Sequence, residues 1–162
     1  MPDIPVDRAR QRYTGMYALH ETLSIGVEVN PLADDVGALV NWRAVDETER
    51  RPALILGTSS DRIGTTSGRA YYATASKDIE QWTDLPVAPY VGGAYGEFDE
   101  EWVLIGGLRI RWGKKVSTTH MWDGHNLHHL VNVPVHERFQ LGGLLVEQEG
   151  KHYFGLTIGT TF

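Results

Sequence analysis

The chain has 162 residues, a formal net charge of −6 at pH 7 and no cysteine. A single domain is expected from this length. The lack of cysteine excludes disulfides, thiolate metal ligands and thiol nucleophiles, and the acidic balance argues against nucleic acid as a partner. No run of about 18 apolar residues is present, so no transmembrane helix is predicted. The polar N-terminus predicts no secretory signal peptide.

The first 14 residues are polar, include two prolines and are interpreted as an N-terminal arm (1–14). Residues 15–162 are interpreted as one β-barrel or β-sheet domain, because apolar and polar residues alternate there with a period of two. In the window 17–30 only Glu21 interrupts an apolar face, which consists of Tyr17, Leu19, Leu23, Ile25, Val27 and Val29.

Further alternating segments follow, separated by turn-forming residues. They cover 36–45, 49–60, 68–77, 86–98, 102–112, 116–122, 127–135, 138–148 and 152–162. Residues 76–85 are predicted to contain a short helix. Alternating segments joined by short turns predict an all-β, antiparallel meander of about 8–10 strands. A closed up-and-down barrel is the predicted form, because closure removes exposed sheet edges.

The second face of these strands is unusual for a sheet in water. It consists mostly of Gly, Ala, Ser and Thr, whereas a soluble barrel carries many charged residues there. The chain contains 18 glycines, many of them inside predicted strands, where glycine normally weakens a sheet. Charged residues concentrate in turns such as 34–35, 46–47, 99–101 and 114–115. This distribution is typical of a barrel in lipid.

The segment 102–112 provides a test of dimensions. Trp102 and Trp112 share a face and bracket four apolar or small residues. Ten residues at about 3.3 Å each, tilted by about 40–45°, span about 24 Å, close to the apolar band of about 25 Å that aromatic girdles flank in such barrels. The residues predicted to face a membrane or a partner protein are Trp42, Trp102, Trp112, Phe154 and Phe162.

Residues 51–162 resemble the porin-like hairpins of bacterial outer-membrane β-barrel proteins. In that class the last strand typically ends in a C-terminal Phe or Trp, with apolar residues at every second position before it. The ending "HYFGLTIGTTF" matches this pattern at Phe162, Ile158, Leu156 and Phe154, whereas Thr160 departs from it. The resemblance implies that this end is the address read by the barrel-assembly machinery.

Two functional hypotheses follow from the two-faced alternation. The first is a non-enzymatic outer-membrane-type barrel with a filled or narrow interior and a structural, adhesive or narrow-solute role, with the lipid bilayer as its partner. The second is a soluble or peripheral β-sheet accessory subunit that docks on and stabilises a larger protein assembly, such as a membrane-bound one. The expected location is the outer membrane if a signal peptide is removed, and otherwise the cytoplasmic side, peripheral to a membrane complex. The sequence names no small-molecule ligand.

A third hypothesis is a carbohydrate-binding module. The segments around Asp78 and Asp123 loosely resemble the Asp-box turns of sialidase-type β-propellers, and they lie 45 residues apart, which is close to one propeller blade. The first segment lacks the glycine of that motif and the second lacks its final tryptophan.

Five of the seven histidines lie within residues 120–136. A hairpin there would bring His120 close to His128 or His129, with Asp123 adjacent, and zinc or copper accepts such a donor set. The alternative interpretation of these three metal candidates is that they are polar residues at the rim of a barrel. Arg109 and Arg111 share a face and are predicted to point inward.

An inward arginine pair would find partners in Glu28 or Glu147. The sequence contains no Gly-x-Gly-x-x-Gly, Walker or nucleophile-elbow pattern. No catalytic residues, no enzymatic activity and no cofactor are therefore predicted.

Overall fold

The computed structural model describes residues 1–113 and 115–161. Phe162, one of the predicted membrane- or partner-facing aromatics, lies outside the described residues. The strands are β1 (Tyr13–His20), β2 (Leu23–Asn30), β3 (Asp35–Val45), β4 (Ala53–Ser60), β5 (Arg69–Ser76), β6 (Val87–Gly96), β7 (Glu101–Trp112), β8 (Val116–Trp122), β9 (Leu127–His136), β10 (Phe139–Gln148) and β11 (Lys151–Thr160). Short helices are α1 (Asp7–Arg10), the 3-10 helix η1 (Pro31–Ala33) and α2 (Glu80–Thr83).

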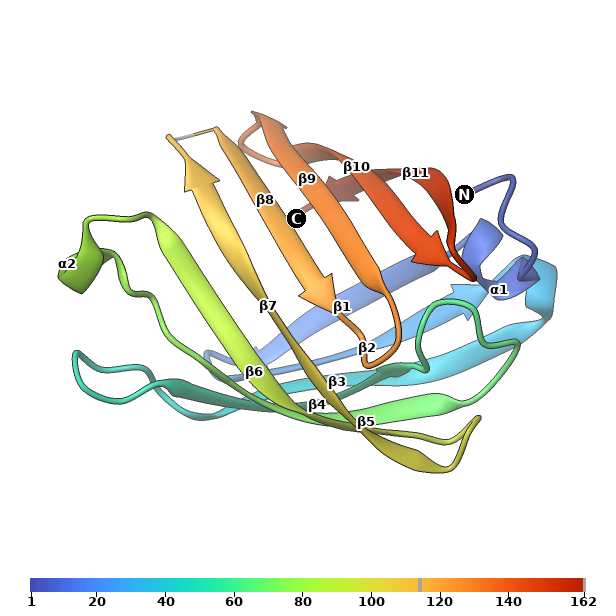
Figure 1. Ribbon diagram of the computed structural model, residues 1–162, viewed down its shortest axis with the longest axis horizontal. Coiled ribbons are helices and arrows are strands. Elements are labelled where there is room, and N and C mark those ends of the chain that lie inside the picture. The colour runs from blue at the N-terminus through green and yellow to red at the C-terminus, as the bar shows by residue number, and fades with distance from the viewer. Residues whose placement is uncertain (114, 162) are drawn as a thin grey trace.

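All eleven strands form one antiparallel sheet in which each strand pairs with its neighbours in the chain (Figure 1). The all-β, antiparallel meander predicted from the sequence is therefore confirmed. The structure has more strands than the predicted 8–10, because residues 17–30 form a hairpin with a turn at Glu21 and Thr22. Tyr17 pairs with Ile25 across this hairpin, so its two strands keep the same apolar parity and read as one long segment.

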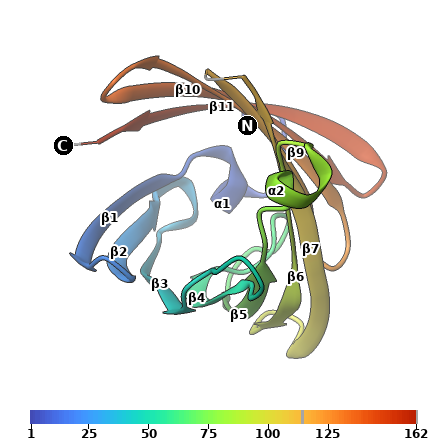
Figure 2. The ribbon, with the colours of Figure 1, turned by 90° about the vertical axis from the view of Figure 1, so that its left-hand side faces the viewer.

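The sheet curls around an interior and has β1 and β11 as its edges (Figure 2). No ladder joins these two strands among the described residues. The sheet is therefore open along one seam, and its closure into a barrel stays a prediction. No helix in the described part of the chain is long and apolar enough to cross a membrane.

The polarity of the curled sheet is inverted relative to a protein folded in water. The largest fully buried side chains are mostly polar and comprise Glu28, Asn30, Thr65, His128, Ile4 and Val146. Large apolar side chains instead cover the convex outer face, where Trp102 is 73% exposed and Leu104 is 69% exposed. An interior of hydrogen-bonded polar groups with an apolar exterior suits a surrounding medium that is itself apolar.

The strand registers assign each residue to the outer or the inner face. On β7 the outer parity runs through Trp102 and Leu104, and the pairings carry this parity to the neighbouring strands. When the first and last two residues of each strand are set aside, the outer parity of the described strands contains no Lys, Arg, Asp or Glu. The charged residues predicted to avoid the strands thus lie at strand ends, in loops or inside.

Exposed aromatic side chains gather at the two ends of the sheet. We call the end where odd-numbered strands begin, next to α1, the α1 rim; it carries Tyr13, Tyr71, Phe98, Trp102, Trp122 and Phe154. The opposite end, next to α2, is the α2 rim and carries Trp42, Trp82, Trp112 and Phe139. At the α1 rim Tyr71, Tyr95 and Trp102 are successive cross-strand partners, and the Tyr95 and Trp102 rings lie 5.6 Å apart.

Curvature explains why so many glycines occur inside strands. On the concave face, a Cβ at Gly92 would lie 2.0 Å from the carbonyl oxygen of Ala73, and one at Gly107 would lie 2.2 Å from that of His120. On the convex face, a Cβ at Gly15 or Gly143 would meet no atom within 4 Å. Inward glycines therefore permit close backbone approach, which a strand with side chains at these positions would prevent.

Adjacent glycines on β6 test this interpretation. We expect Gly92→Ala to destabilise the fold by about 1–3 kcal/mol, because the new methyl group collides with backbone that cannot move aside. Gly93→Ala faces outward, where the nearest atom would be 3.8 Å from the Cβ, and is expected to change the free energy of unfolding by less than about 0.5 kcal/mol. Denaturant titration of both variants under one solvent condition measures the difference; equal effects would contradict the crowding argument.

Candidate functional site

An apolar cavity of about 230 Å³ lies against the inner face of the sheet towards the α1 rim. Its walls are apolar or aromatic and come from β5 to β8; they include Tyr72, Tyr90, Ala94, Val103, Ile105 and Met121. Its mouth is polar and is lined by Asp61, Arg62, Asp99, Glu101, Asp123 and His125. Carboxylates outnumber cationic groups among these residues at the mouth.

The N-terminal arm helps to close the interior next to this cavity. Ile4 is fully buried, and the side chain of Arg8 enters the interior from α1. The Arg8 guanidinium donates hydrogen bonds to the carbonyl oxygens of Gly68 (2.8 Å) and Asp61 (3.2 Å) and to the hydroxyl of Thr65. These contacts fasten α1 to the loop between β4 and β5. The predicted polar arm thus packs against the interior through the side chains of Ile4 and Arg8, whereas most of its other residues are exposed.

An ion pair connects the residue before β1, Arg12, to Glu28 in the interior. The Arg12 guanidinium donates to the Glu28 carboxylate at 2.6 Å and to the Ser60 hydroxyl at 3.0 Å. Asn30 donates its side-chain amide to the same carboxylate at 3.0 Å. Glu28 is 1% exposed, and a buried carboxylate requires such partners because an unpaired one is costly.

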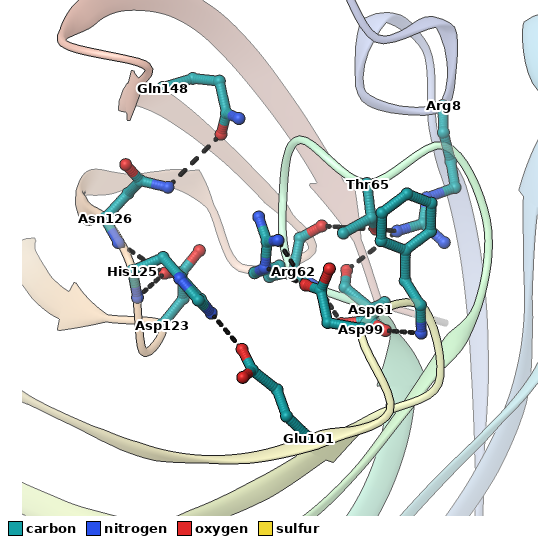
Figure 3. A network of polar contacts seen from close by, with 11 residues as sticks. Arg8, Asp61, Arg62, Thr65, Asp99, Glu101, Asp123, His125, Asn126 and Gln148 are labelled. Carbon is teal, nitrogen blue, oxygen red and sulfur yellow. Dashed lines mark hydrogen bonds and ion pairs between the residues drawn. The ribbon is translucent and has the colours of Figure 1, made fainter.

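Asp61 connects the two loops at the cavity mouth (Figure 3). Its carboxylate accepts hydrogen bonds from the backbone N–H of Arg62 at 2.7 Å and of Phe98 at 2.9 Å. The neighbouring Arg62 side chain forms an ion pair with Asp99. The β4–β5 loop and the β6–β7 turn are therefore held together by one acidic and one basic side chain.

The turn between β8 and β9 contains two of the three predicted metal candidates. The Asp123 carboxylate lies 2.7 Å from Nε2 of His128 and accepts the backbone N–H groups of His125 and Asn126. Burial opposes ionisation of Asp123, but these hydrogen bonds outweigh it and hold the pKa of this carboxyl below its ordinary value of 3.8. The geometry explains the residues as a turn-stabilising pair.

The third predicted metal candidate, His120, lies elsewhere. His120 and His129 are cross-strand partners on the outer face, with their Nδ1 atoms 2.7 Å apart, whereas His128 pairs with Met121 on the inner face. Successive residues of a strand point to opposite faces. The sequence therefore placed the correct strands side by side, but it could not place His120 with Asp123 and His128.

A different donor set lies at the cavity mouth. Ligand atoms of Asp99, Glu101 and His125 lie within 4.8 Å of one another. In this structure His125 is 3.0 Å from the Glu101 carboxylate, and Asp99 is engaged by Arg62. All three side chains are exposed, and their mutual contacts account for them without a metal ion.

Arg109 and Arg111 lie on the inner face of β7, as predicted, but the predicted partners of this pair are wrong. Arg111 pairs with Asp78 at 2.6 Å and with Glu80 at the start of α2, and not with Glu28 or Glu147 as the sequence suggested. The hydrogen bond from Arg111 lowers the pKa of Asp78.

Asp78 and Asp123, the two residues of the predicted Asp-box turns, do not lie in two equivalent propeller blades, because both belong to loops of one continuous sheet. The predicted outward-facing Trp42, Trp102, Trp112 and Phe154 are all exposed.

The interior network contains residues that sequence reasoning did not select, namely Arg8, Arg12, Asp61 and Thr65. Arg8 lies in a polar segment without periodicity, so nothing local marks it as buried. The two glycines near Asp61 are a weak sequence signal for a loop. Gly64 and Gly68 adopt φ angles of 104° and 91°, a backbone conformation that favours glycine. Only the pairing of distant strands brings these groups together.

Substitution of Arg8 tests the closure of the interior by the arm. Arg8→Ala removes the buried donor and leaves the Asp61 carbonyl without it, whereas the Gly68 carbonyl keeps the Asp61 N–H; the free energy of unfolding is expected to fall by about 3 kcal/mol. Asp7→Ala is the control on the same helix, because it removes only the largely exposed Arg10–Asp7 ion pair, which is worth at most about 0.5 kcal/mol. Denaturant unfolding measures both; equal losses would show that Arg8 does not fasten the arm.

The pKa of Asp123 predicts a dependence on pH. Because the pKa is lower in the folded protein, the stabilisation by the carboxylate is fully present above about pH 4 and is lost as the pH falls through the folded-state pKa. The stability difference between the unmodified protein and Asp123→Asn should therefore shrink as the pH is lowered from about 4 through the folded-state pKa of Asp123. Unfolding curves across this range measure it, and a constant difference would contradict the prediction.

Comparison of the chain with protein-family models, with curated proteins and with solved structures gave no match. The function is therefore argued from the geometry described above.

Proposed function

We propose that this protein is a non-enzymatic β-barrel of the outer-membrane type, embedded in lipid through its outer face, with a structural role and a narrow, partly filled interior. The observation that carries this proposal is the inverted polarity of the sheet. Ionic and polar groups such as Arg8, Glu28 and His128 are buried inside, and the outer parity of the described strands lacks charged side chains away from strand ends.

Exposure of this outer face to water would be unfavourable. Large apolar side chains lie on the outer parity from β1 to β11, including Tyr17, Val91, Leu104 and Leu156. Each contributes roughly 25 cal/mol for every square ångström of apolar surface removed from water. Soluble monomers rarely leave continuous patches of more than a few hundred square ångströms exposed, so this face needs a covering medium.

A lipid surrounding explains the observed distribution of apolar side chains better than a protein partner does. A docking partner typically covers one patch of a surface, whereas the apolar residues here extend over the whole convex side of the sheet. The aromatic residues at the α1 rim and the α2 rim match the girdles at the two interfaces of a membrane barrel. The second hypothesis, an accessory subunit of a larger assembly, lacks a comparable single feature.

The interior supports a narrow passage or none. The arm and the β4–β5 loop partly fill the α1 rim through Ile4 and Arg8. The apolar cavity of about 230 Å³ and a second cavity of about 610 Å³, lined by the arm, this loop and the edge strands, lie beside them. Side chains alone fill barrels of about eight strands, so the inserted arm and loop are what narrow the interior of this wider sheet. A structural or narrow-solute role is therefore favoured over a wide pore.

A charged side chain introduced on the outer face distinguishes a lipid surrounding from an aqueous one. We expect Val91→Arg to reduce the free energy of folding into phospholipid vesicles by about 2–4 kcal/mol, because Val91 lies on the outer parity near the middle of β6 and would face hydrocarbon. Leu32→Arg is the control: the Leu32 side chain is about as exposed as that of Val91 (53% and 54%), but it lies in η1 at the rim, where about 0–1 kcal/mol is expected.

The outcome separates the hypotheses. Equal, small effects of the two substitutions, together with a protein that stays monomeric in detergent-free buffer, would overturn the lipid proposal. Loss of a stable protein complex in Val91→Arg, without any loss of vesicle insertion, would instead support the accessory subunit. A shift in gel mobility on heating the vesicle-inserted protein is the further expected result.

A further inference from the structure

The two edge strands are the most exposed part of the sheet. All eight residues of β1 are exposed, including Thr14, Met16 and Ala18 on the inner parity. On β11, Ile158 is 80% exposed, whereas Leu141, its cross-strand partner on β10, is 46% exposed. Both edges therefore present side chains and backbone groups that lack a neighbouring strand in the described structure.

The directions of the strands restrict how the seam can close. Neighbouring strands alternate in direction, so the odd-numbered β1 and β11 run the same way. Direct pairing between them would create a parallel ladder in a sheet that is otherwise antiparallel. One additional strand, antiparallel to both edges, would close the sheet with antiparallel pairs throughout.

The distance between the two edges excludes direct pairing and leaves room for an additional strand. Most Cα atoms of β1 lie more than 8 Å from those of β11, whereas directly paired strands lie about 4.8 Å apart and two strands that flank a third lie about 9.6 Å apart. A cavity of about 610 Å³ borders the seam. Tyr13 and Thr14 of β1 and Leu156 and Ile158 of β11 line one part of this cavity, and the N-terminal arm and the β4–β5 loop line most of the rest.

We propose that the seam between β1 and β11 binds one extended strand of a partner polypeptide from outside residues 1–162, running antiparallel to both edges. This inference rests on the proposed function, because backbone N–H and C=O groups cannot stay unpaired in hydrocarbon. Main-chain hydrogen bonds provide the affinity of such strand addition, and alternate side chains provide its specificity.

The edges define the chemistry of the strand that fits. Inward positions must be small, because they meet the inner side of β11 at Gly155, where the Met1 side chain already lies close. Outward positions must be apolar, because they continue the face formed by Tyr17 and Leu156. A strand of about eight to ten residues that alternates apolar and small polar side chains meets both requirements.

The absence of native cysteine allows a direct test of the seam. Three double variants combine Thr157→Cys on β11 with Thr14→Cys, Met16→Cys or Ala18→Cys on β1. Cysteines form a disulfide when their Cα atoms lie about 4.4–6.8 Å apart. We expect no intramolecular disulfide in any of the three under mild oxidation. A disulfide would show direct pairing of β1 with β11 and would overturn the proposal.

A peptide probe tests occupancy and direction. The probe is a synthetic ten-residue peptide of alternating Leu and Thr with one Cys near its N-terminus. We expect it to form a disulfide with Ala18→Cys, near the end of β1, at least about tenfold more than with Thr14→Cys, near the beginning. A control peptide with two central prolines lacks two backbone N–H donors and should react with Ala18→Cys at least about tenfold less than the alternating peptide.

Each remaining outcome is decisive. Equal reaction of the proline peptide, or failure of the alternating peptide to react, would overturn the proposal. Disulfide-linked dimers formed without peptide would assign the seam to a second copy of this chain and would also overturn it. The cross-linking is read in detergent solution, so it can fail or succeed independently of the vesicle insertion that tests the proposed function.

Discussion

The pairing of every strand with its neighbours, with apolar side chains on the convex side, is the constraint on which the rest of the structure depends. Eleven antiparallel strands pair their backbone groups with those of their neighbours, except along the outer edges of β1 and β11. Their period of two sends alternate side chains outward and inward. Once the outer face is apolar, charged groups can remain only in the loops, at strand ends or inside. The buried hydrogen bonds of Arg8 and the ion pair between Arg12 and Glu28 follow from this division.

The concave interior has little space, and the chain uses that space in two ways. Where strands approach closely, as at Gly92 and Gly107, a Cβ would collide with neighbouring backbone. Where the interior is wider, at the α1 rim, the N-terminal arm and the β4–β5 loop fill it through polar contacts centred on Arg8 and Asp61. The same inner surface leaves one apolar cavity whose mouth is lined by acidic groups.

The sequence predicted features that depend on local alternation. The β7 segment, the turns around it and the exposure of Trp102 and Trp112 agree with the structure. The strand count was too low because the β1–β2 turn at Glu21 preserves the apolar parity across the hairpin. The partners of Arg111 were wrong because Glu28 lies on another part of the curled sheet, whereas Asp78 and Glu80 lie beside Arg111.

Local patterning thus establishes an all-β chain with one apolar face, because alternation in a strand needs no knowledge of distant residues. The register and curvature of the sheet establish which distant residues meet. They bring Arg8 to the β4–β5 loop, place His120 and His128 on opposite faces of the sheet, and keep β1 apart from β11. Such contacts join residues far apart in the chain, so their geometry depends on every pairing between them.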